Sequence, residues 1–341
     1  MSAQDASLSL KNKFSYKWNL ANRYPAKGID YHGTTVMSTF ACGGGSTMGY
    51  KLAGYDVVAA NDIDPQMAKV YKANHDTKQY FLCGVKELLQ RDDLPQVDLL
   101  DGSPPCSLFS TAGIREKGWQ QDKKFREGQA KQILDDLFFD FIDLAEKMKP
   151  KVVIAENVKG MLIGNAKWYT REVVRRFSRI GYKCQVFLLN SATMGVPQRR
   201  ERVFFIAHKS DANVKLIFNE PSIRFKEISD STDRECNLTE KYIEYWKQAK
   251  QGDSVGKFVS KRKENWSLVP RTVVSGGRNY HPHYKRELND KEISLIGSWP
   301  LDYDFQKIDA QYLIGMSVPP VMMAQVADQV YNQLIKSMDK A

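Results

Sequence analysis

A short apolar segment that runs directly into a cluster of glycines limits the possible folds of this chain more than any other feature. Residues 34–40 read TTVMSTF, and residues 42–49 read CGGGSTMG. The first segment is β-branched and apolar, which predicts a buried strand. A helix with apolar positions at Met48, Leu52 and Ala53 is expected to follow. A strand, a glycine turn and a helix in this order indicate the first unit of an α/β fold.

The same alternation continues to about residue 210. Further strands are predicted at 57–64, 97–102, 151–158, 183–190 and 202–207, and helices at 65–74, 129–148 and 168–180. Strands that alternate with helices form mostly parallel sheets with helices on both faces. The sequence therefore predicts a Rossmann-like, mostly parallel sheet that is covered on both sides.

The pattern changes after residue 210. Residues 211–270 are polar, mixed in charge and weakly periodic, and they include the basic, aromatic-flanked stretch KFVSKRKENW at 257–266. From residue 286 the chain again has a helical pattern, and residues 319–335 predict an amphipathic helix with proline in its first turn. We expect a large domain at 1–210, a small inserted domain at 211–270, and a remainder at 271–341 that ends in a helix returning to the large domain.

The charge balance favours a polyanionic partner. The formal net charge is +10, and a basic surplus of this kind raises the local concentration of nucleic acid. No apolar run approaches the roughly 18 residues of a membrane span, and the N-terminus lacks the apolar core of a signal peptide. The five cysteines are an odd number without a C-x-x-C pair, which argues against a disulfide framework and a zinc site. We expect a cytoplasmic protein with no bound metal.

The glycine cluster is followed by acids at the end of the next predicted strand. Gly43, Gly44 and Gly45 would let the backbone approach a ligand, and Asp62 or Asp64 could hold ribose hydroxyls. The same arrangement serves dinucleotides and S-adenosylmethionine, and a tight turn without any ligand gives the same pattern. These residues alone leave the ligand open.

A cysteine follows the strand predicted at 97–102, in the stretch DGSPPCSLFS at 101–110. Ligands of open parallel sheets bind beyond the carboxyl ends of the strands, so Cys106 is expected at the mouth of the site. Pro104 and Pro105 restrict the backbone before it. Free cysteines are usually inert and buried, but a strand-end loop favours a nucleophile. The glycines and cations at 107–128 predict a basic loop that closes over a phosphate backbone.

Three motifs carry a resemblance to a known family. PPC-x-x-F-S at 104–110, ENV at 156–158 and QRRER at 198–202 occur in the order found in DNA cytosine-5 methyltransferases. The chain resembles that family from about residue 34 to 335. The resemblance implies a Rossmann-like methyltransferase sheet with a small target-recognition domain, S-adenosylmethionine as cofactor and double-stranded DNA as substrate. It also implies a bacterial or phage-encoded monomer for which a cognate restriction endonuclease is a candidate partner.

The resemblance also implies the chemistry of individual residues. Cys106 would add to carbon 6 of cytosine, which activates carbon 5 toward the sulfonium methyl group. Glu156 would hold the exocyclic amine and protonate ring nitrogen 3, for which a closed pocket must raise its pKa. Arg202 would lie near the cytosine 2-oxygen and Arg200 near the phosphates. The target base must leave the duplex to react.

The family's binding residues transfer to matching positions of this chain. The implied cofactor residues are Phe40, Gly43, Gly44, Gly45, Asp62, Ile63, Pro105 and Ser317. The implied DNA contacts are Ser110, Arg115, Gln198, Lys261, Arg262 and Lys263, with Ser110 on a phosphate and Gln198 supporting the edge of the inserted domain.

Three positions depart from the family pattern. Cys42 stands where the first glycine of F-x-G-x-G-G belongs, and Gly84 stands where an acid usually ends the third strand. Met316 replaces an asparagine before Val318-Pro319-Pro320 and cannot make that residue's hydrogen bonds. These departures concern cofactor affinity more than catalysis.

Three other functions are compatible with parts of this pattern. A cytosine-5 methyltransferase acting on transfer RNA shares the catalytic motifs. A catalytically silent DNA-binding relative would fit the altered cofactor positions, although Cys106 and Glu156 are intact. A nicotinamide-dependent oxidoreductase would share only the glycine loop and leaves the other three motifs unexplained.

Overall fold

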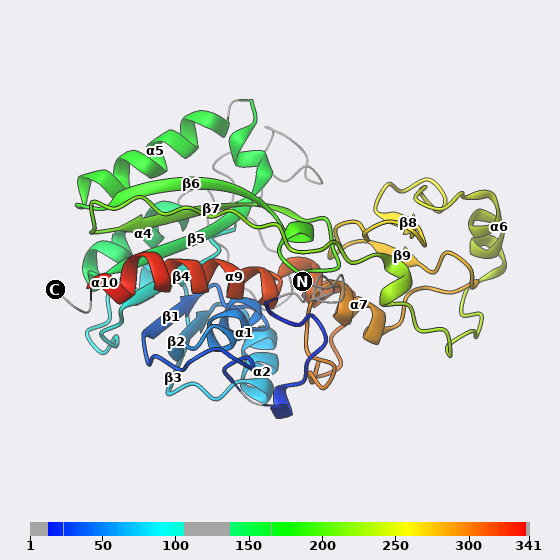
Figure 1. The fold of residues 1–341 in the computed structure, drawn as a ribbon, viewed down its shortest axis with the longest axis horizontal. Coiled ribbons are helices and arrows are strands. Elements are labelled where there is room, and N and C mark those ends of the chain that lie inside the picture. Colours follow the sequence, from blue (N-terminus) through cyan, green and yellow to red (C-terminus); the bar gives the residue numbers. More distant parts are fainter. Residues whose placement is uncertain (1–12, 23, 106–136, 165, 339–341) are drawn as a thin grey trace, which may run out of the picture.

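The computed structural model describes residues 13–22, 24–105, 137–164 and 166–338, and its centre is one large sheet (Figure 1). Within these residues the sheet has seven strands in the order β3-β2-β1-β4-β5-β7-β6. Of these strands β7 alone runs opposite to the other six, so the predicted mostly parallel α/β fold is confirmed. The strands are β1 (Thr35–Thr39), β2 (Asp56–Asp62), β3 (Gln79–Leu82), β4 (Leu99–Gly102), β5 (Val152–Val158), β6 (Lys183–Asn190) and β7 (Glu201–His208).

Helices cover both faces of this sheet. Neighbouring residues of each strand point to opposite faces, and Leu99 and Leu100 accordingly belong to two different core clusters. The cluster on one face includes side chains of α1 (Gly45–Leu52) and α9 (Pro320–Val330). The cluster on the other face includes α3 (Val85–Leu88), α4 (Leu137–Met148) and α5 (Ala166–Arg179). Burial on both faces explains why apolar residues follow one another along the central strands instead of alternating with exposed polar ones.

The helix α9 lies along the sheet beside α1 (Figure 1). Gly49 allows this close approach, because a Cβ atom there would lie 2.5 Å from the Cβ of Met323. After α9 the chain continues as a π-helical turn (Tyr331–Ile335) and α10 (Lys336–Met338). Residues from both ends of the chain therefore build one face of the same core.

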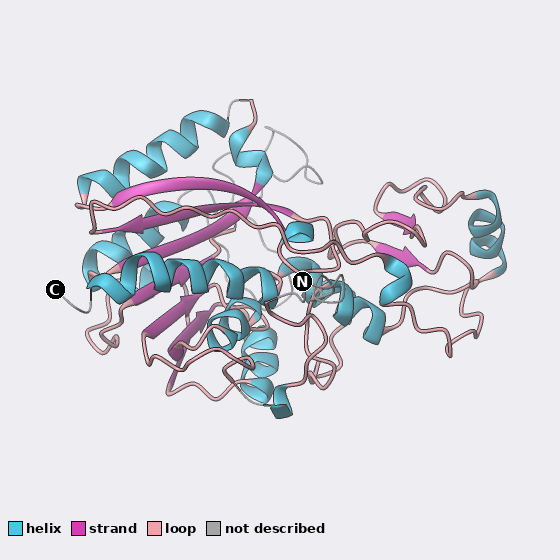
Figure 2. Cartoon of the chain, viewed as in Figure 1, coloured by secondary structure: helices cyan, strands magenta, loops and turns pink. Residues whose placement is uncertain are grey.

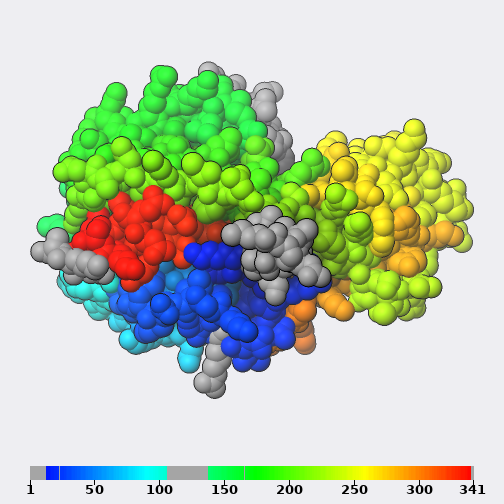
Figure 3. Space-filling view, viewed as in Figure 1, coloured from blue at the N-terminus to red at the C-terminus, as the bar shows by residue number. Residues whose placement is uncertain are grey.

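A second lobe projects from the sheet and consists mostly of loops (Figure 2). We call residues 230–288 the small lobe. It contains α6 (Glu240–Gln248) and the short parallel pair β8 (Lys261–Lys263) and β9 (Arg278–Tyr280), packed around Trp246, Val255 and Tyr280. The space-filling view shows it as a distinct body beside the large domain (Figure 3).

Shorter elements complete the chain. The helix α2 (Pro65–Asn74) spans the residues predicted for it, whereas the stretch 81–88 divides at Gly84 into the end of β3 and α3. The chain leaves the small lobe through α7 (Asp290–Ile296) and α8 (Ala310–Met316). Single 3₁₀ turns lie at Leu20–Asn22, Lys159–Leu162, Ser191–Thr193 and Phe225–Glu227. None of the helices in the described ranges combines the length and apolar character needed to cross a bilayer.

Candidate active site

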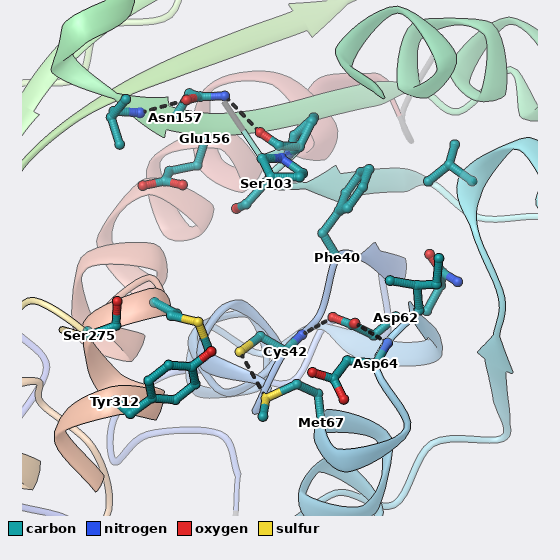
Figure 4. Close-up of a pocket in the computed structure, with 18 of the residues that line it drawn as sticks. Phe40, Cys42, Asp62, Asp64, Met67, Ser103, Glu156, Asn157, Ser275 and Tyr312 are labelled. Atoms are coloured by element: carbon teal, nitrogen blue, oxygen red, sulfur yellow. Dashed lines mark hydrogen bonds between the residues drawn. The ribbon is translucent and has the colours of Figure 1, made fainter. Parts of the chain in front are cut away.

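A cavity of about 420 Å³ opens beyond the carboxyl ends of β1, β2, β4 and β5, where open α/β sheets bind their ligands. One wall comes from the end of β4 and from β5 with its neighbour β7, and we call it the β5 wall. The opposite wall follows β1 and β2, and we call it the β2 wall. Figure 4 shows Glu156 entering from the first wall and Asp62 lying in the second. Residues of α8, including Tyr312 and Met316, also line the cavity.

An ion pair lies at the centre of the β5 wall. Arg202 on β7 holds Glu156 on β5, with 2.8 Å between Nε and Oε1, and both side chains are largely buried. These antiparallel strands place the two residues diagonally opposite each other. Burial lowers the pKa of Arg202, and the charge of Glu156 opposes that shift. The pair presents one acidic and one basic group to the same small space.

The loop after β4 is fixed to the same wall by Asn157. The Asn157 amide donates a hydrogen bond of 2.9 Å to the carbonyl of Pro104, and its oxygen accepts from the backbone of Val158 at 2.8 Å. Pro104 and Pro105 both line the cavity. The predicted nucleophile Cys106 lies outside the described residues, as do Ser110 and Arg115.

Two acids organise the β2 wall. Asp62 accepts backbone hydrogen bonds from Cys42 at 2.8 Å and from Asp64 at 2.9 Å. Burial raises the pKa of Asp62, and these backbone donors oppose the shift. Asp64 caps α2 through a hydrogen bond of 2.8 Å from the backbone of Gln66. Phe40, Asp62 and Ile63, all predicted cofactor residues, line the cavity together with Asp64.

The predicted glycines are placed behind this wall and are not among the lining residues. Gly44 has a φ of +84°, and a Cβ atom there would lie 2.1 Å from the ring of His75. A Cβ atom on Gly45 would lie 2.3 Å from the carbonyl oxygen of Val318, and one on Gly43 would meet Leu313 at 2.9 Å. The glycines therefore let the loop pack tightly and hold the lining residues in place.

The three departures from the family pattern all line the cavity. Cys42 keeps a left-handed backbone with a φ of 48°, and its sulfur lies 3.5 Å from that of Met67. Burial raises the pKa of the Cys42 thiol to about 12, so it stays protonated. Gly84 begins α3, and Glu87 accepts a hydrogen bond of 3.1 Å from its backbone. Met316 is 40% exposed at the cavity.

Arg200 and Gln198 connect the large domain to later parts of the chain. The Arg200 guanidinium is 2% exposed and donates to the carbonyls of Val273, Gly315 and Ser317 at 2.9–3.0 Å. Gln198 donates to the carbonyl of Ile296 at 3.2 Å and accepts from the backbone of Val273 at 3.0 Å. Arg200 also lines the cavity, and its expected place near the phosphates stays a prediction. Ser317 likewise points inward, to the carbonyl of Leu313 at 2.8 Å.

The three predicted cations of the small lobe lie on one strand and point in two directions. The ammonium of Lys263 is buried and donates to the carbonyls of Trp246 and Ala249 at 3.0 and 3.2 Å. Lys261 donates a hydrogen bond to the hydroxyl of Tyr242, and Tyr242, like Trp246, lies on α6. Because side chains alternate along a strand, Arg262 points away from α6. Lys263 thus stabilises the lobe, which differs from its expected place at the DNA.

Asp101 lies behind the cavity, and we made no prediction for it. It is 1% exposed at the end of β4 and accepts hydrogen bonds from Ser38 at 2.7 Å and Tyr50 at 3.1 Å. Burial raises its pKa to about 7, and the charge of Glu156 contributes in the same direction. Its signal in the sequence was an acid inside an otherwise apolar strand. These hydrogen bonds connect β4 with Ser38 of β1 and Tyr50 of α1. β4 leads to the β5 wall, and β1 and α1 lie behind the β2 wall.

Comparisons with known proteins agree on one family. The model described as C-5 cytosine-specific DNA methylase matches residues 34–267. The chain is 27% identical to the Type II methyltransferase M.NgoPII of Neisseria gonorrhoeae, over 89% of this chain and 97% of that protein. It is 26% identical to M1.HphI of Haemophilus parahaemolyticus, over 87% and 86%. A structure described as a candidate DNA modification methyltransferase from an E. coli prophage superimposes with a TM-score of 0.71 at 18% identity, covering 89% of this chain and all of that one.

Proposed function

Because the chain belongs to the C-5 cytosine-specific DNA methylase family, we propose that it methylates carbon 5 of a cytosine flipped out of a short duplex DNA site. The methyl donor is S-adenosylmethionine, and Cys106 forms a transient bond to the base. The observation that supports this proposal most is the Glu156–Arg202 pair, which faces the two acids of the β2 wall across one cavity. A base and a methyl donor that enter from opposite walls would meet between them.

The β2 wall fits the proposed cofactor. Asp62 and Asp64 offer carboxylates for ribose hydroxyls, and Phe40, Ile63 and Val85 offer apolar surface for a purine ring. S-adenosylmethionine supplies an electrophilic methyl group on a sulfonium. The acids also suit the positive charge of that sulfonium and of the donor's amino group.

The β5 wall fits the polar edge of cytosine. Arg202, a donor, suits the 2-oxygen, and Glu156 suits ring nitrogen 3 and the exocyclic amine. The ion pair holds the carboxylate in place before the base arrives, so little reorganisation is needed. Glu156 must therefore gain a proton once the base is bound and pass it to nitrogen 3 while the Cys106 thiolate adds to carbon 6. Carbon 5, activated by this addition, would then take the methyl group from the sulfonium, and the donor would leave as S-adenosylhomocysteine. Loss of the proton on carbon 5 expels Cys106, and return of the nitrogen 3 proton to Glu156 restores the ring.

The loop that carries Cys106 begins from a fixed point. Asn157, the neighbour of Glu156, holds the carbonyl of Pro104 at 2.9 Å. The two prolines restrict the backbone between that anchor and Cys106. This arrangement supports a nucleophile whose starting position is tied to the acid that assists it.

The setting of the reaction follows from the same family. The Type II names of the bacterial relatives support a cognate restriction endonuclease as partner and the cytoplasm as location. We expect the enzyme to act as a monomer. The division into catalytic, target-recognition and C-terminal segments at residues 210 and 270 likewise remains a prediction.

Bisulfite sequencing of DNA from cells that express the protein tests the proposed function directly. We expect methylated cytosines in one short sequence context, absent from cells that express Cys106→Ala. Purified protein should also transfer labelled methyl groups to duplex DNA and not to transfer RNA. Transfer to transfer RNA alone would contradict the DNA substrate. Cofactor binding without any transfer would support a silent DNA-binding relative.

A further inference from the structure

Two adjacent apolar side chains are exposed at a turn of the small lobe. Phe258 is 62% exposed and Val259 is 68% exposed. The turn is closed by a hydrogen bond of 3.0 Å from the backbone of Lys261 to the carbonyl of Phe258. Single exposed apolar residues are common on protein surfaces. A pair at the tip of a closed turn is more unusual, and it has no role in the site described above.

Short connections tie this turn to the wall of the cavity. The carbonyl of Ser260 accepts a hydrogen bond of 3.1 Å from the backbone of Arg278. The guanidinium of Arg278 contacts Asp309 at 2.9 Å, and Asp309 caps α8. Tyr312 and Met316 of α8 line the cavity. The apolar turn is therefore mechanically linked to the place where the base is expected to bind.

A second connection runs through the chain that precedes Arg278. Val274 and Ser275 line the cavity, and the backbone of Gly277 donates to Val274 at 3.0 Å. A Cβ atom on Gly277 would lie 2.5 Å from the carbonyl oxygen of Ser260. The two segments thus pack in direct backbone contact. Only a few residues separate the exposed pair from the cavity wall.

The charges around the turn favour nucleic acid as the occupant. Residues 250–262 carry one acid, Asp253, against four cations: Lys250, Lys257, Lys261 and Arg262. The ammonium of Lys261 lies 5.6 Å from the centre of the Phe258 ring. An apolar tip bordered by cations suits a base step bordered by phosphates. A purely apolar protein surface would gain nothing from these charges.

Resting on the proposed function, we propose that Phe258 and Val259 form an apolar wedge that enters the duplex beside the target cytosine. Removing a base from the stack costs a few kcal/mol, and apolar side chains inserted between base steps offset part of such a cost. The flanking cations hold the adjacent backbone while the wedge unstacks the step. The wedge assists extrusion of the base, and the groups of the β5 wall then act on it.

The double variant Phe258→Ala/Val259→Ala tests the wedge on two DNA substrates. One is the paired duplex site, and the other carries an abasic nucleotide opposite the target, so that the cytosine is already unpaired. We expect kcat/KM to fall about ten- to a hundredfold on the paired duplex and less than about threefold on the unpaired one. The fluorescence rise of 2-aminopurine placed at the target should weaken in parallel.

A matched control separates the wedge from general loss of apolar surface. Ile217 is 76% exposed outside the small lobe, two residues after Lys215, whose backbone donates a hydrogen bond to Gln333. Ile217→Ala should leave both substrates unaffected. Phe258→Leu/Val259→Ile should retain most of the activity on paired DNA. Cofactor affinity and melting temperature of each variant report whether the protein is folded.

Three results would overturn the wedge. Equal losses on paired and unpaired DNA would show that the turn only helps to hold DNA. Full activity of the double variant on the paired duplex would show that the turn is not used. A wild type that methylates no DNA would refute the proposed function itself, and the wedge with it.

Discussion

The two walls of the cavity differ in how closely they keep the family pattern. The β5 wall has the expected Glu156 and Arg202, which form a direct ion pair of 2.8 Å. The β2 wall carries the unusual residues Cys42 and Gly84. Each is accommodated locally, since Cys42 keeps the left-handed backbone of a glycine and Gly84 begins a helix. In the proposed reaction the β5 wall holds the groups that must meet the reacting atoms, whereas the β2 wall would hold the cofactor through several contacts and carries the two unusual residues.

The largest effect that this comparison predicts belongs to Cys106. Cys106→Ala removes the only nucleophile in the proposed reaction, so we expect methyl transfer to fall by at least about a thousandfold. Binding of S-adenosylmethionine should stay within about twofold of wild type, because the β2 wall is untouched. Radiolabelled methyl transfer and calorimetry measure the two quantities.

A covalent trap provides the complementary measurement for the same residue. DNA with 5-fluorocytosine at the target lacks the proton that must leave, so wild-type protein should remain attached to it in denaturing gels. The alanine variant should form no such adduct. Normal turnover or trapping by that variant would remove Cys106 from the mechanism.

Glu156 gives the next largest expected effect. Glu156→Gln keeps the shape of the side chain but removes the carboxyl that must carry a proton, so kcat should fall about a hundred- to a thousandfold. The KM for the cofactor should change little. A rise in the cofactor KM as large as the fall in kcat would mean that the two walls do not act independently. Steady-state kinetics with each substrate varied in turn distinguishes these outcomes.

The sequence predicted the elements that local patterns determine. β6 and the helix α2 appear at the residues expected for them, because apolar periodicity and caps specify them. The antiparallel direction of β7 could also have been predicted from the sequence. The link of Ser191 to Arg200 between β6 and β7 is shorter than the dozen or more residues that a parallel crossover needs. The length of the connection between two strands therefore indicates their relative direction, and we did not use it.

Side-chain direction in the site depended on contacts that the sequence does not record. A shift of one residue in β8 would turn Lys263 outward and Arg262 inward, and nothing in KRK fixes that register. The burial of Arg200 depends on carbonyls more than seventy residues away. Local motifs therefore predicted several residues that line the cavity, and tertiary packing decided which of the predicted side chains point into it.

Asp101 connects the two walls and gives a prediction about pH. Its pKa is raised to about 7 in the folded protein, whereas an unfolded chain loses this proton near the ordinary value of 3.8. Folding stability from this group is therefore complete below pH 4 and is lost as the pH rises to about 7. One pKa unit corresponds to roughly 1.4 kcal/mol, so the loss is on the order of a few kcal/mol.

Urea unfolding at pH 5 and pH 8 measures this contribution. Asp101→Asn should lose less free energy of unfolding between these values than wild type does. Glu264, buried in the small lobe with a pKa raised to about 7, supplies a matched control at a distance from the cavity. Glu264→Gln should reduce the pH dependence similarly while leaving the cofactor KM unchanged. If Asp101→Asn unfolds with the full wild-type pH dependence, its carboxyl is ionised in the fold.

Cys42 gives the smallest expected effect and tests the β2 wall most directly. Cys42→Gly relieves a left-handed backbone, worth roughly 1–2 kcal/mol, but removes the buried contact of its sulfur with Met67. The two changes oppose each other, so the free energy of unfolding should stay within about 1 kcal/mol of wild type. The KM for the cofactor should shift by less than about tenfold, with kcat within about twofold. Gly44→Ala is the contrasting variant, since its Cβ atom would lie 2.1 Å from His75 and should disrupt the loop. A fall in kcat for Cys42→Gly as large as that for Glu156→Gln would show that both walls are equally intolerant of change.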